Sequence, residues 1–479
     1  MSQKSSSTSS GSVVSTETGT ATVPMGKGIG VRGVVFLVAA GAAPLAAAVA
    51  VFPVVVSASE SPVSPLFFVV AALALAVFAV GFTRMAHEVT DAGAFYDFIR
   101  AGLGHVCGRG AATLALVSYA LLFVALVGYL GASTASAIEY FTGAVIPWWA
   151  WSTVSLFITG VLAYRDIALS TKVLGVSLVL ELAIMLVLDF VVVFRGGPEG
   201  TTASALNPLH FTDGTPSLGL MFAFFGFVGF EATVIFRSEA RNPRRTIPRA
   251  TYVSIVAIGL FYAFSLFAVA VGTGPNSLVA KAIENPQTLV TELAWTFLGV
   301  FGQDAVQILV LVSLFGCFLT FHNVLARFTF NFGAAGLLPS ALGRAHPRHH
   351  APSRASLAVT AYCLLAIAGS VMLGLDPVLD LYTWFSGAAT LGIIVLMALT
   401  SLAVIVFFRG HERGSWLTTF IAPTVSLVAF GALVFLVVKN FPLLVGGYGV
   451  AVALIAVLAI ALAGGAASSF VSRSSARNL

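Results

Sequence analysis

The sequence predicts an all-α protein whose helices cross a membrane many times. Three observations favour this class: hydrophobic residues make up 58% of the 479 residues, charged residues make up only 9%, and the mean hydropathy is +0.99. Soluble globular domains are typically about 25% charged and no more than about half apolar, so the composition excludes an ordinary soluble enzyme. It also excludes general disorder, which requires low hydrophobicity and high charge.

Apolar stretches long enough to cross a bilayer define the expected helices. A hydrocarbon core of about 30 Å needs about 20 residues of helix. The fourth stretch opens on Trp148, Trp149 and Trp151, an aromatic cluster typical of a membrane interface. Twelve stretches are predicted to span: 33–56, 65–83, 110–132, 146–163, 173–194, 217–236, 250–272, 299–326, 355–374, 381–408, 416–438 and 442–464.

The positions of the basic residues predict the orientation. Of the 24 Lys and Arg, only Arg195, Lys281 and Lys439 fall in the connections on one side. Positive charge resists translocation, so the side with the other 21 basic residues is predicted to be cytoplasmic. Both termini are expected on that side, and the protein is expected in the cell (plasma) membrane. Residues 1–28 and 466–479 are then cytoplasmic tails, the first of them Ser-rich and expected to be disordered. Because topology accounts for the net charge of +5, we expect no nucleic-acid partner.

Two of the predicted spans are interrupted by residues that break helices. In the first span, Ala40, Gly41, Ala42 and Ala43 precede Pro44, which cannot donate to the helix ladder. In the sixth, two glycines bracket the helix centre. Interrupted segments at matching positions of two halves indicate a transporter site, whereas the alternative is that small residues only permit close packing. The substrate-binding candidates are Ala40, Gly41, Ala42, Ala43, Gly226, Phe227, Val228, Gly229 and Phe230, with Tyr119 and Trp384 as further aromatic candidates.

Three acidic residues lie inside the spans, namely Glu181, Asp189 and Glu231. An acidic side chain at a helix centre costs about 2.5–3.5 kcal/mol on insertion scales, so it usually faces a cavity or a partner. A carboxyl that is desolvated in one gate state and hydrated in another binds and releases a proton. Glu231 and Glu181 are therefore candidates for proton coupling or gating. A structural, hydrogen-bonded role is the alternative for Glu181, and a structural or interfacial role is the expectation for Asp189.

Other motif matches do not indicate functional sites. We expect neither a bound cofactor nor a bound metal, and we do not expect the protein to be an enzyme. Gly28–Gly33 fits G-x-G-x-x-G but opens a membrane helix and lacks the acidic residue about 20 positions on that a dinucleotide site needs. His346, His349 and His350 share a basic loop with no thiol or acidic partner. No Walker loop or kinase signature is present, so ATP-driven pumping is unsupported.

A longer motif resembles a known family. Phe225 to Glu231, followed by Glu239, Asn242-Pro243, Arg244 and Ile247-Pro248-Arg249-Ala250, is similar to the amino acid–polyamine–organocation (APC) permease superfamily. A second match follows the eighth span, at Asn323, Ala326-Arg327, Gly336, Leu338-Pro339, His346-Pro347 and Pro352. The likeness covers roughly residues 30 to 465. One departure is that Gly41-Ala42-Ala43-Pro44 lacks the hydroxyl of the G-S-G-like break that many relatives carry in helix one.

The resemblance implies a permease domain over 29–465, with twelve transmembrane helices. A 5+5 inverted repeat, 29–195 and 216–408, would be followed by two C-terminal helices in 416–464. It also implies that Glu231 occupies the place of a gating carboxylate, and that Glu181 lies near a position where other relatives carry a lysine in place of a sodium ion. Pro248 is expected in the first turn of the seventh helix, where its missing N–H costs nothing.

The expected function is secondary active transport. The protein would import an amino acid or related amine by alternating access, with protons as the coupling ion and the lipid bilayer as its surroundings. The alternatives within transport are a polyamine or organic-cation permease and an amino acid exchanger. An alternative of another class is a membrane sensor that binds its ligand without transporting it.

Overall fold

The computed structural model describes residues 28–89, 95–165, 171–235, 237, 240–346, 352–410 and 415–475. The tail 1–27 and the motif residue Glu239 lie outside these ranges. Within them the chain is helical, and its only β contacts are two isolated bridges, Ile29 with Ala240 and Gly197 with Gly200. The main helices are α1 (Val31–Ala42), α2 (Pro44–Ser59), α3 (Pro65–Glu88), α4 (Phe95–Thr142), α5 (Trp148–Tyr164), α6 (Thr171–Arg195), α7 (Pro216–Phe225), α8 (Ala232–Ile235), α9 (Pro243–Thr273), α10 (Leu278–Glu284), α11 (Leu289–Ala334), α12 (Ser353–Met372), α13 (Thr383–Arg409), α14 (Ala422–Leu444) and α15 (Tyr448–Ser475).

The described helices confirm an all-α membrane protein. Nine of them are long and apolar enough to cross a membrane, and the bent pair α1 and α2 makes a tenth span if it is counted as one. The other two predicted spans coincide with shorter helices. Span 146–163 matches α5, which has 17 residues, and span 217–236 matches α7, a turn region and α8. The count of twelve and the inverted repeat therefore stay predictions.

Two helices are much longer than their predicted spans. Helix α4 has 48 residues and α11 has 46, against expected spans of 110–132 and 299–326. Each contains one glycine with a left-handed φ close to its start, Gly104 at 86° and Gly299 at 71°. Only glycine adopts these angles without strain, so each long helix has a short segment before the glycine and a long segment after it.

The seventh predicted helix begins earlier than expected. Helix α9 starts at Pro243, so Pro248 lies inside the helix, and the expectation that Pro248 belongs to its first turn is wrong. Pro243 takes the first helical position, where the absence of an N–H costs nothing. The helix continues through Pro248, and one turn later the Thr251 hydroxyl donates to the Ile247 carbonyl at 2.9 Å.

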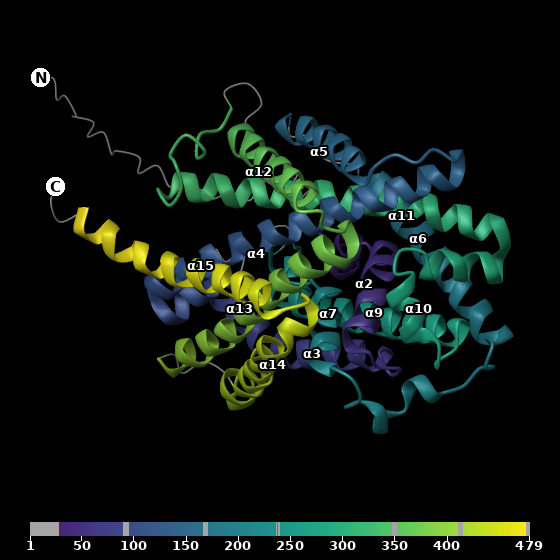
Figure 1. Cartoon of the computed structure of the whole chain (residues 1–479). Coiled ribbons are helices and arrows are strands. Elements are labelled where there is room, and N and C mark those ends of the chain that lie inside the picture. The colour runs from purple at the N-terminus through teal and green to yellow at the C-terminus, as the bar shows by residue number, and fades with distance from the viewer. Residues whose placement is uncertain are drawn as a thin grey trace, which may run out of the picture.

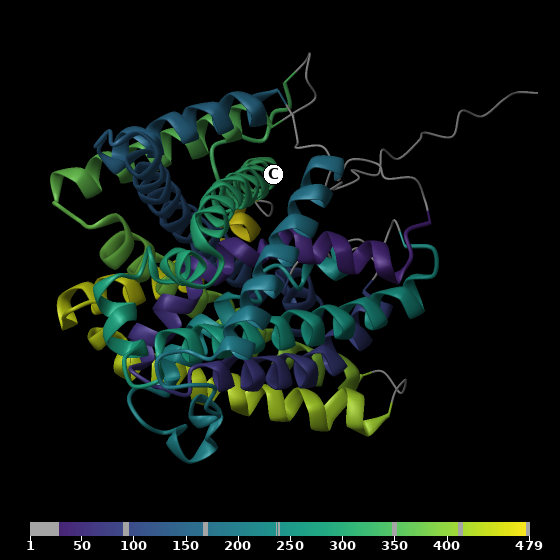
Figure 2. The same ribbon diagram turned by 90° about the vertical axis from the view of Figure 1, so that its right-hand side faces the viewer.

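The centre of the protein is built on α2. Fourteen of its 16 residues are buried, which is expected of a helix that is apolar on all sides. Helices α2 and α7 lie at the centre of Figure 1, α5 and α12 pair along one border, and α3 and α14 pack together on the opposite side. Figure 2 gives the perpendicular view, in which α2 remains surrounded by other helices.

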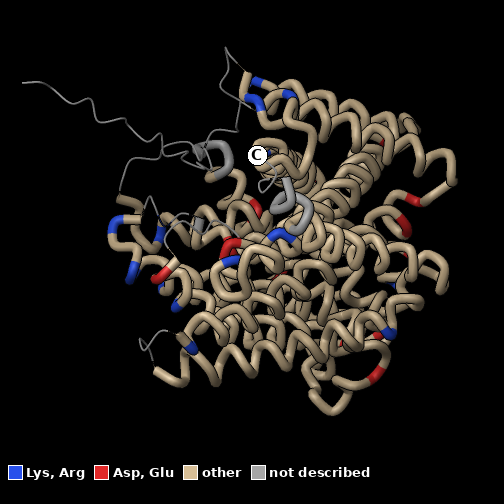
Figure 3. Tube along the Cα trace, turned by 90° about the vertical axis from the view of Figure 1, so that its left-hand side faces the viewer, with Lys and Arg blue, Asp and Glu red and all other residues tan. Residues whose placement is uncertain are grey.

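The charges are unevenly distributed over the surface. Lys and Arg gather mainly on the left of Figure 3, whereas the right carries several acidic segments and few basic ones. The helices between the two ends are nearly free of charge, which is the pattern of a protein embedded in a bilayer.

Candidate functional site

The first predicted break is a sharp bend between α1 and α2. Helix α1 ends at Ala42, α2 begins at Pro44, and the two are inclined by 48°. Ala43 between them has φ 45° and ψ 69°, a left-handed conformation that costs a non-glycine residue about 1–2 kcal/mol. Pro44 suits the first position of α2 because it has no N–H to satisfy. Strain of this kind persists where the surrounding structure holds it, often at a functional site.

The second break follows α7. Helix α7 ends at Phe225, residues 226–231 form turns, and the four-residue α8 follows. Gly229 has φ 107°, which an L side chain rarely adopts. The Glu231 carboxylate stabilises this turn by accepting a hydrogen bond from the Gly229 N–H at 2.9 Å and another from its own backbone N–H.

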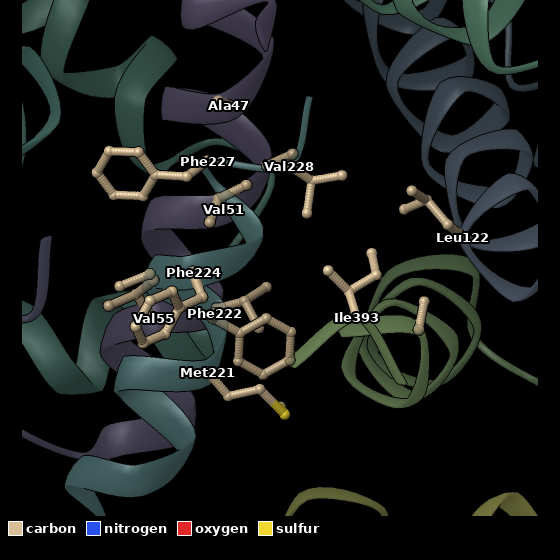
Figure 4. Close-up of a cluster of buried hydrophobic side chains, with 14 of the residues drawn as sticks. Ala47, Val51, Val55, Leu122, Met221, Phe222, Phe224, Phe227, Val228 and Ile393 are labelled. Carbon is tan, nitrogen blue, oxygen red and sulfur yellow. The ribbon is translucent and has the colours of Figure 1, made fainter. Parts of the chain in front are cut away.

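The two breaks border one central cavity of about 50 Å³. In Figure 4, Val51 of α2, Val228 of the second break and Leu122 of α4 surround the same space. The cavity is small, with room for a few water molecules, so a larger ligand requires it to expand. Its lining is Gly41, Ala42, Ala43, Ala46, Ala47, Val51, Leu122, Leu126, Phe225, Gly226, Val228, Leu314, Cys317, Phe321 and Tyr382.

A second cavity of about 170 Å³ lies on the other side of the first break, between α1, α6 and α11. It shares Gly41, Ala43 and Cys317 with the central cavity. Its one acidic lining residue is Glu181, which is 3% exposed.

The Glu181 carboxylate has two hydrogen-bond partners. The Ser177 hydroxyl lies 2.7 Å from Oε1 and the Ser313 hydroxyl 2.8 Å from Oε2. The backbone N–H of Leu45, in the first turn of α2, also faces this carboxylate. One carboxylate therefore connects α6, α11 and the broken first helix.

Glu231 connects the second break to α4. The Tyr119 hydroxyl donates to Glu231 Oε1 at 2.8 Å, and the Tyr119 ring stacks on Phe328 of α11 with centroids 5.3 Å apart. The third intramembrane acid, Asp189, accepts a hydrogen bond from Ser265 at 2.5 Å and lines neither cavity.

Nine predicted site residues can be placed relative to the two cavities or the core. Gly41, Ala42, Ala43, Gly226 and Val228 line the central cavity, and Ala40 and Glu181 line the second. Phe227 and Phe230 instead point into the core. Phe227 contacts the Phe68 and Tyr262 rings, and Phe230 contacts the Phe78 and Phe82 rings.

The remaining predicted residues lie near the cavities without lining them. Gly229, Glu231 and Tyr119 form the hydrogen-bonded group beside the second break. Trp384 is partly buried against the core and lines neither cavity. Sequence reasoning missed Tyr382 and Cys317, which line the central cavity, because neither residue belongs to a break or carries a charge.

Aromatic residues close the central cavity on one side. The rings of Tyr129 and Tyr382 lie 4.7 Å apart, and the Tyr129 hydroxyl donates to the Val49 carbonyl at 3.0 Å. The Val49 carbonyl lacks its usual donor within the helix because Pro53, four residues later in α2, has no N–H. A third cavity of about 380 Å³ has in its lining Ala132, three residues after Tyr129, and Pro377, five residues before Tyr382, together with Glu139, Glu284 and Trp148.

The segment after α8 contacts the C-terminal end of α3 and the residues before α1. The Arg237 guanidinium donates to the carbonyls of Ala86, of His87 at 3.3 Å and of Val89 at 3.1 Å, at the C-terminal end of α3. The Arg241 N–H donates to the Ile29 carbonyl at 3.0 Å, next to the Ile29–Ala240 bridge. A cation is favourable at a helix C-terminus, where unpaired carbonyls carry partial negative charge.

Comparison with known proteins identifies relatives that are transporters. The amino acid permease family matches residues 29–462. The branched-chain amino acid permease BcaP of Bacillus subtilis is 26% identical over 306 residues, 60% of this chain and 63% of the relative. The low-affinity putrescine importer PlaP of Escherichia coli is 23% identical over 312 residues, 63% and 66% of the two chains. A methylthioribose transporter of Bacillus subtilis is 24% identical over 287 residues, 58% and 56%.

The chain thus spans less than two thirds of the length of each of these relatives. The family match, in contrast, includes both broken helices and every residue that lines the two cavities beside them. The chain belongs to the amino acid permease family.

Proposed function

We propose that the protein is a secondary active transporter that imports an amino acid or related amine by alternating access at the breaks in the first and sixth spans. The observation that carries this proposal is the central cavity, which the α1–α2 break and the turns after α7 border together. Interrupted helices place main-chain polar groups at membrane depth only where those groups line a cavity or are buried in protein.

The architecture supports a transporter with two repeats and twelve spans. The segment before Gly104 in α4 and the segment before Gly299 in α11 are equivalent features of two long helices. These helices belong to the proposed repeats 29–195 and 216–408, and the breaks after Ala42 and Phe225 open the same two repeats. The charge distribution in Figure 3 is consistent with a plasma-membrane protein whose basic end, with both tails, is cytoplasmic.

Alternating access requires a barrier on each side of the cavity. The Tyr129–Tyr382 pair is the proposed outer barrier, because Tyr382 lines the central cavity while Ala132 and Pro377, close to the two tyrosines in sequence, line the third cavity. The Arg237 contacts with the end of α3 are the proposed inner barrier. With both barriers in place the cavity is closed, which agrees with its small volume.

Proton coupling is assigned to Glu231 and Glu181. Glu231 links the second break to α4 through Tyr119, and Glu181 links α6 to α11 through Ser313 beside a cavity that the first break also lines. Movement of either break would change the hydrogen bonds and the hydration of these groups, and so their proton occupancy. Proton binding would thereby accompany the opening of one barrier and the closing of the other.

The experiment that tests this function is uptake into proteoliposomes that contain the purified protein. Labelled branched-chain amino acids, putrescine and methylthioribose are the first candidates, since relatives transport them. Accumulation of at least one compound, increased by an inward proton gradient, is expected. A protein that binds a candidate but accumulates none of them under any gradient would be a sensor rather than a carrier.

A further inference from the structure

The donors at the first break are nearly all used by the protein itself. In the first turn of α2, Pro44 has no N–H, the Leu45 N–H faces the Glu181 carboxylate, and Ala47 donates to the Ala43 carbonyl at 2.9 Å. Among these first four residues, only the Ala46 N–H faces no acceptor in the described part of the chain. An anionic ligand would normally bind the free N–H groups at such a helix start, but the Glu181 carboxylate already occupies this position.

The donors at the second break are used in the same way. The N–H groups of Phe227, Val228, Phe230 and Ala232 donate to carbonyls three residues earlier, at 3.0–3.1 Å. The Gly226 N–H donates to the Phe222 carbonyl at 3.2 Å. The Gly229 N–H donates to the Glu231 carboxylate at 2.9 Å, and the Glu231 N–H faces its own carboxylate. No backbone donor of residues 226–232 is left for a ligand.

Acceptors and negative charge remain. At the end of α1, the Ala40 carbonyl accepts from Ala43 at 3.3 Å, and the Ala42 carbonyl accepts from the Tyr262 hydroxyl at 3.4 Å. The Gly41 carbonyl, whose helical partner would be the Leu45 N–H, has no partner among the described residues, and Gly41 lines both cavities. Neither lining contains a Lys, Arg or His that could neutralise Glu181.

From this imbalance we infer that the substrate is a cationic amine that carries no carboxylate, an inference that rests on the proposed transport function. An ammonium group only donates hydrogen bonds, so it suits the free Gly41 carbonyl at the negative end of α1 and a nearby buried carboxylate. The carboxylate of an amino acid would find a single free N–H and the repulsion of Glu181. Burial of an unpaired charge is strongly unfavourable.

The lining of the central cavity determines which part of the amine, besides the ammonium group, fits. Apart from the residues of the breaks, its surface is aliphatic and aromatic, from Val51, Leu122, Leu126, Leu314, Phe321 and Tyr382. Such a lining fits an alkyl chain, as in an alkylamine or a short diamine, better than a polar body.

The test compares pairs of compounds that differ only by the carboxylate. Uptake into proteoliposomes is measured for leucine against 3-methylbutylamine and for ornithine against 1,4-diaminobutane. In at least one pair the amine is expected to have a half-saturation concentration at least ten-fold lower than its amino acid. A half-saturation concentration for the amino acid equal to or lower than that for the amine, in both pairs, would overturn the inference and leave the transport function intact. Accumulation of none of the four compounds, nor of any in the wider set above, would instead refute the transport function itself.

A variant assigns the preference to Glu181. Glu181→Gln keeps the size and hydrogen-bonding capacity of the side chain but removes its charge, so the amine-to-amino-acid preference should fall toward one. The preference is read as the ratio of the amine and amino acid concentrations that half-protect Cys317 from alkylation, because Cys317 lines both cavities and binding is then measured even if the variant no longer transports. Glu60→Gln, at an exposed glutamate beyond the end of α2, should leave the ratio unchanged. A ratio unaltered in Glu181→Gln would show that this carboxylate does not select the amine.

Discussion

Removal of one hydroxyl should open the outer side of the central cavity. Tyr129→Phe keeps the ring contact with Tyr382 but leaves the Val49 carbonyl, which Pro53 has already deprived of its helical partner, without a donor. A buried acceptor without a hydrogen bond costs about 1–3 kcal/mol. In an outward-open state, water can reach this carbonyl, so the penalty applies to the closed state. The equilibrium should therefore shift toward the open state by about five-fold or more, since 1.4 kcal/mol is a factor of ten.

A native thiol reports this shift. Cys317 lines both the central cavity and the Glu181 cavity, so a membrane-impermeant thiol reagent added outside should reach it only past Tyr129 and Tyr382. The rate of Cys317 alkylation, followed by mass spectrometry in right-side-out vesicles, should rise about five-fold or more in Tyr129→Phe.

The matched control for this variant is Tyr140→Phe. Tyr140 lies on the exposed end of α4, the helix that also carries Tyr129. Its hydroxyl donates to Asp304 of α11 at 2.9 Å and to Gln303 at 3.2 Å. Loss of an exposed hydrogen bond should leave the Cys317 alkylation rate at the wild-type value. If Cys317 is also alkylated at the wild-type rate in Tyr129→Phe, the outer barrier is not at Tyr129.

Three other perturbations address coupling, the inner barrier and packing. Glu231→Gln should abolish uptake or remove its pH dependence while expression stays normal, because the carboxylate can no longer exchange a proton. Arg237→Ala should speed alkylation of the cavity thiol from the cytoplasmic side of inside-out vesicles, whereas Arg245→Ala, at an exposed arginine in the first turn of α9, should not. Gly131→Ala should lower the thermal unfolding midpoint by the equivalent of about 1–3 kcal/mol, since its Cβ would approach α5 atoms to within 1.9 Å. Gly431→Ala, inside α14 where no atom lies within 4 Å of the added Cβ, should not lower the midpoint, because Ala favours a helix interior over Gly.

Each of these predictions has an opposing result. Wild-type uptake with wild-type pH dependence would remove Glu231 from the mechanism. Equal cytoplasmic alkylation in the Arg237 and Arg245 variants would place the inner barrier elsewhere. An unaltered midpoint for Gly131→Ala would mean that α4 and α5 separate easily at this contact.

Local signals predicted the features that depend on a few adjacent residues. Proline lacks an N–H wherever it occurs, and Gly229 adopts a left-handed φ that other residues avoid, so the breaks at Ala43 and after Phe225 were visible in the sequence. Helix ends were less predictable. Helices α4 and α11 continue well beyond their apolar spans because hydropathy reports membrane depth rather than helix length. Pro248, expected at a helix start, lies within α9 because Pro243 begins that helix.

The candidate site was predictable only where its contacts are close in sequence. Ser177 lies four residues before Glu181 on α6, a spacing that already places the two side chains together. Ser313, 132 residues from Glu181, and the Leu45 N–H approach it only through tertiary packing. Side-chain direction within irregular turns follows no period, which is why Phe227 and Phe230 were expected at the substrate but point into the core.

The central claim is that substrate binds in the chamber shared by the two breaks, and protection of Cys317 measures this most directly. The alkylation rate of Cys317 is determined with increasing concentrations of the transported compound, and exposed Cys107 serves as the internal reference. Saturable protection of Cys317 alone is expected, half-maximal at the concentration that half-saturates uptake. An alkylation rate that does not change at saturating substrate would show that the compound binds elsewhere.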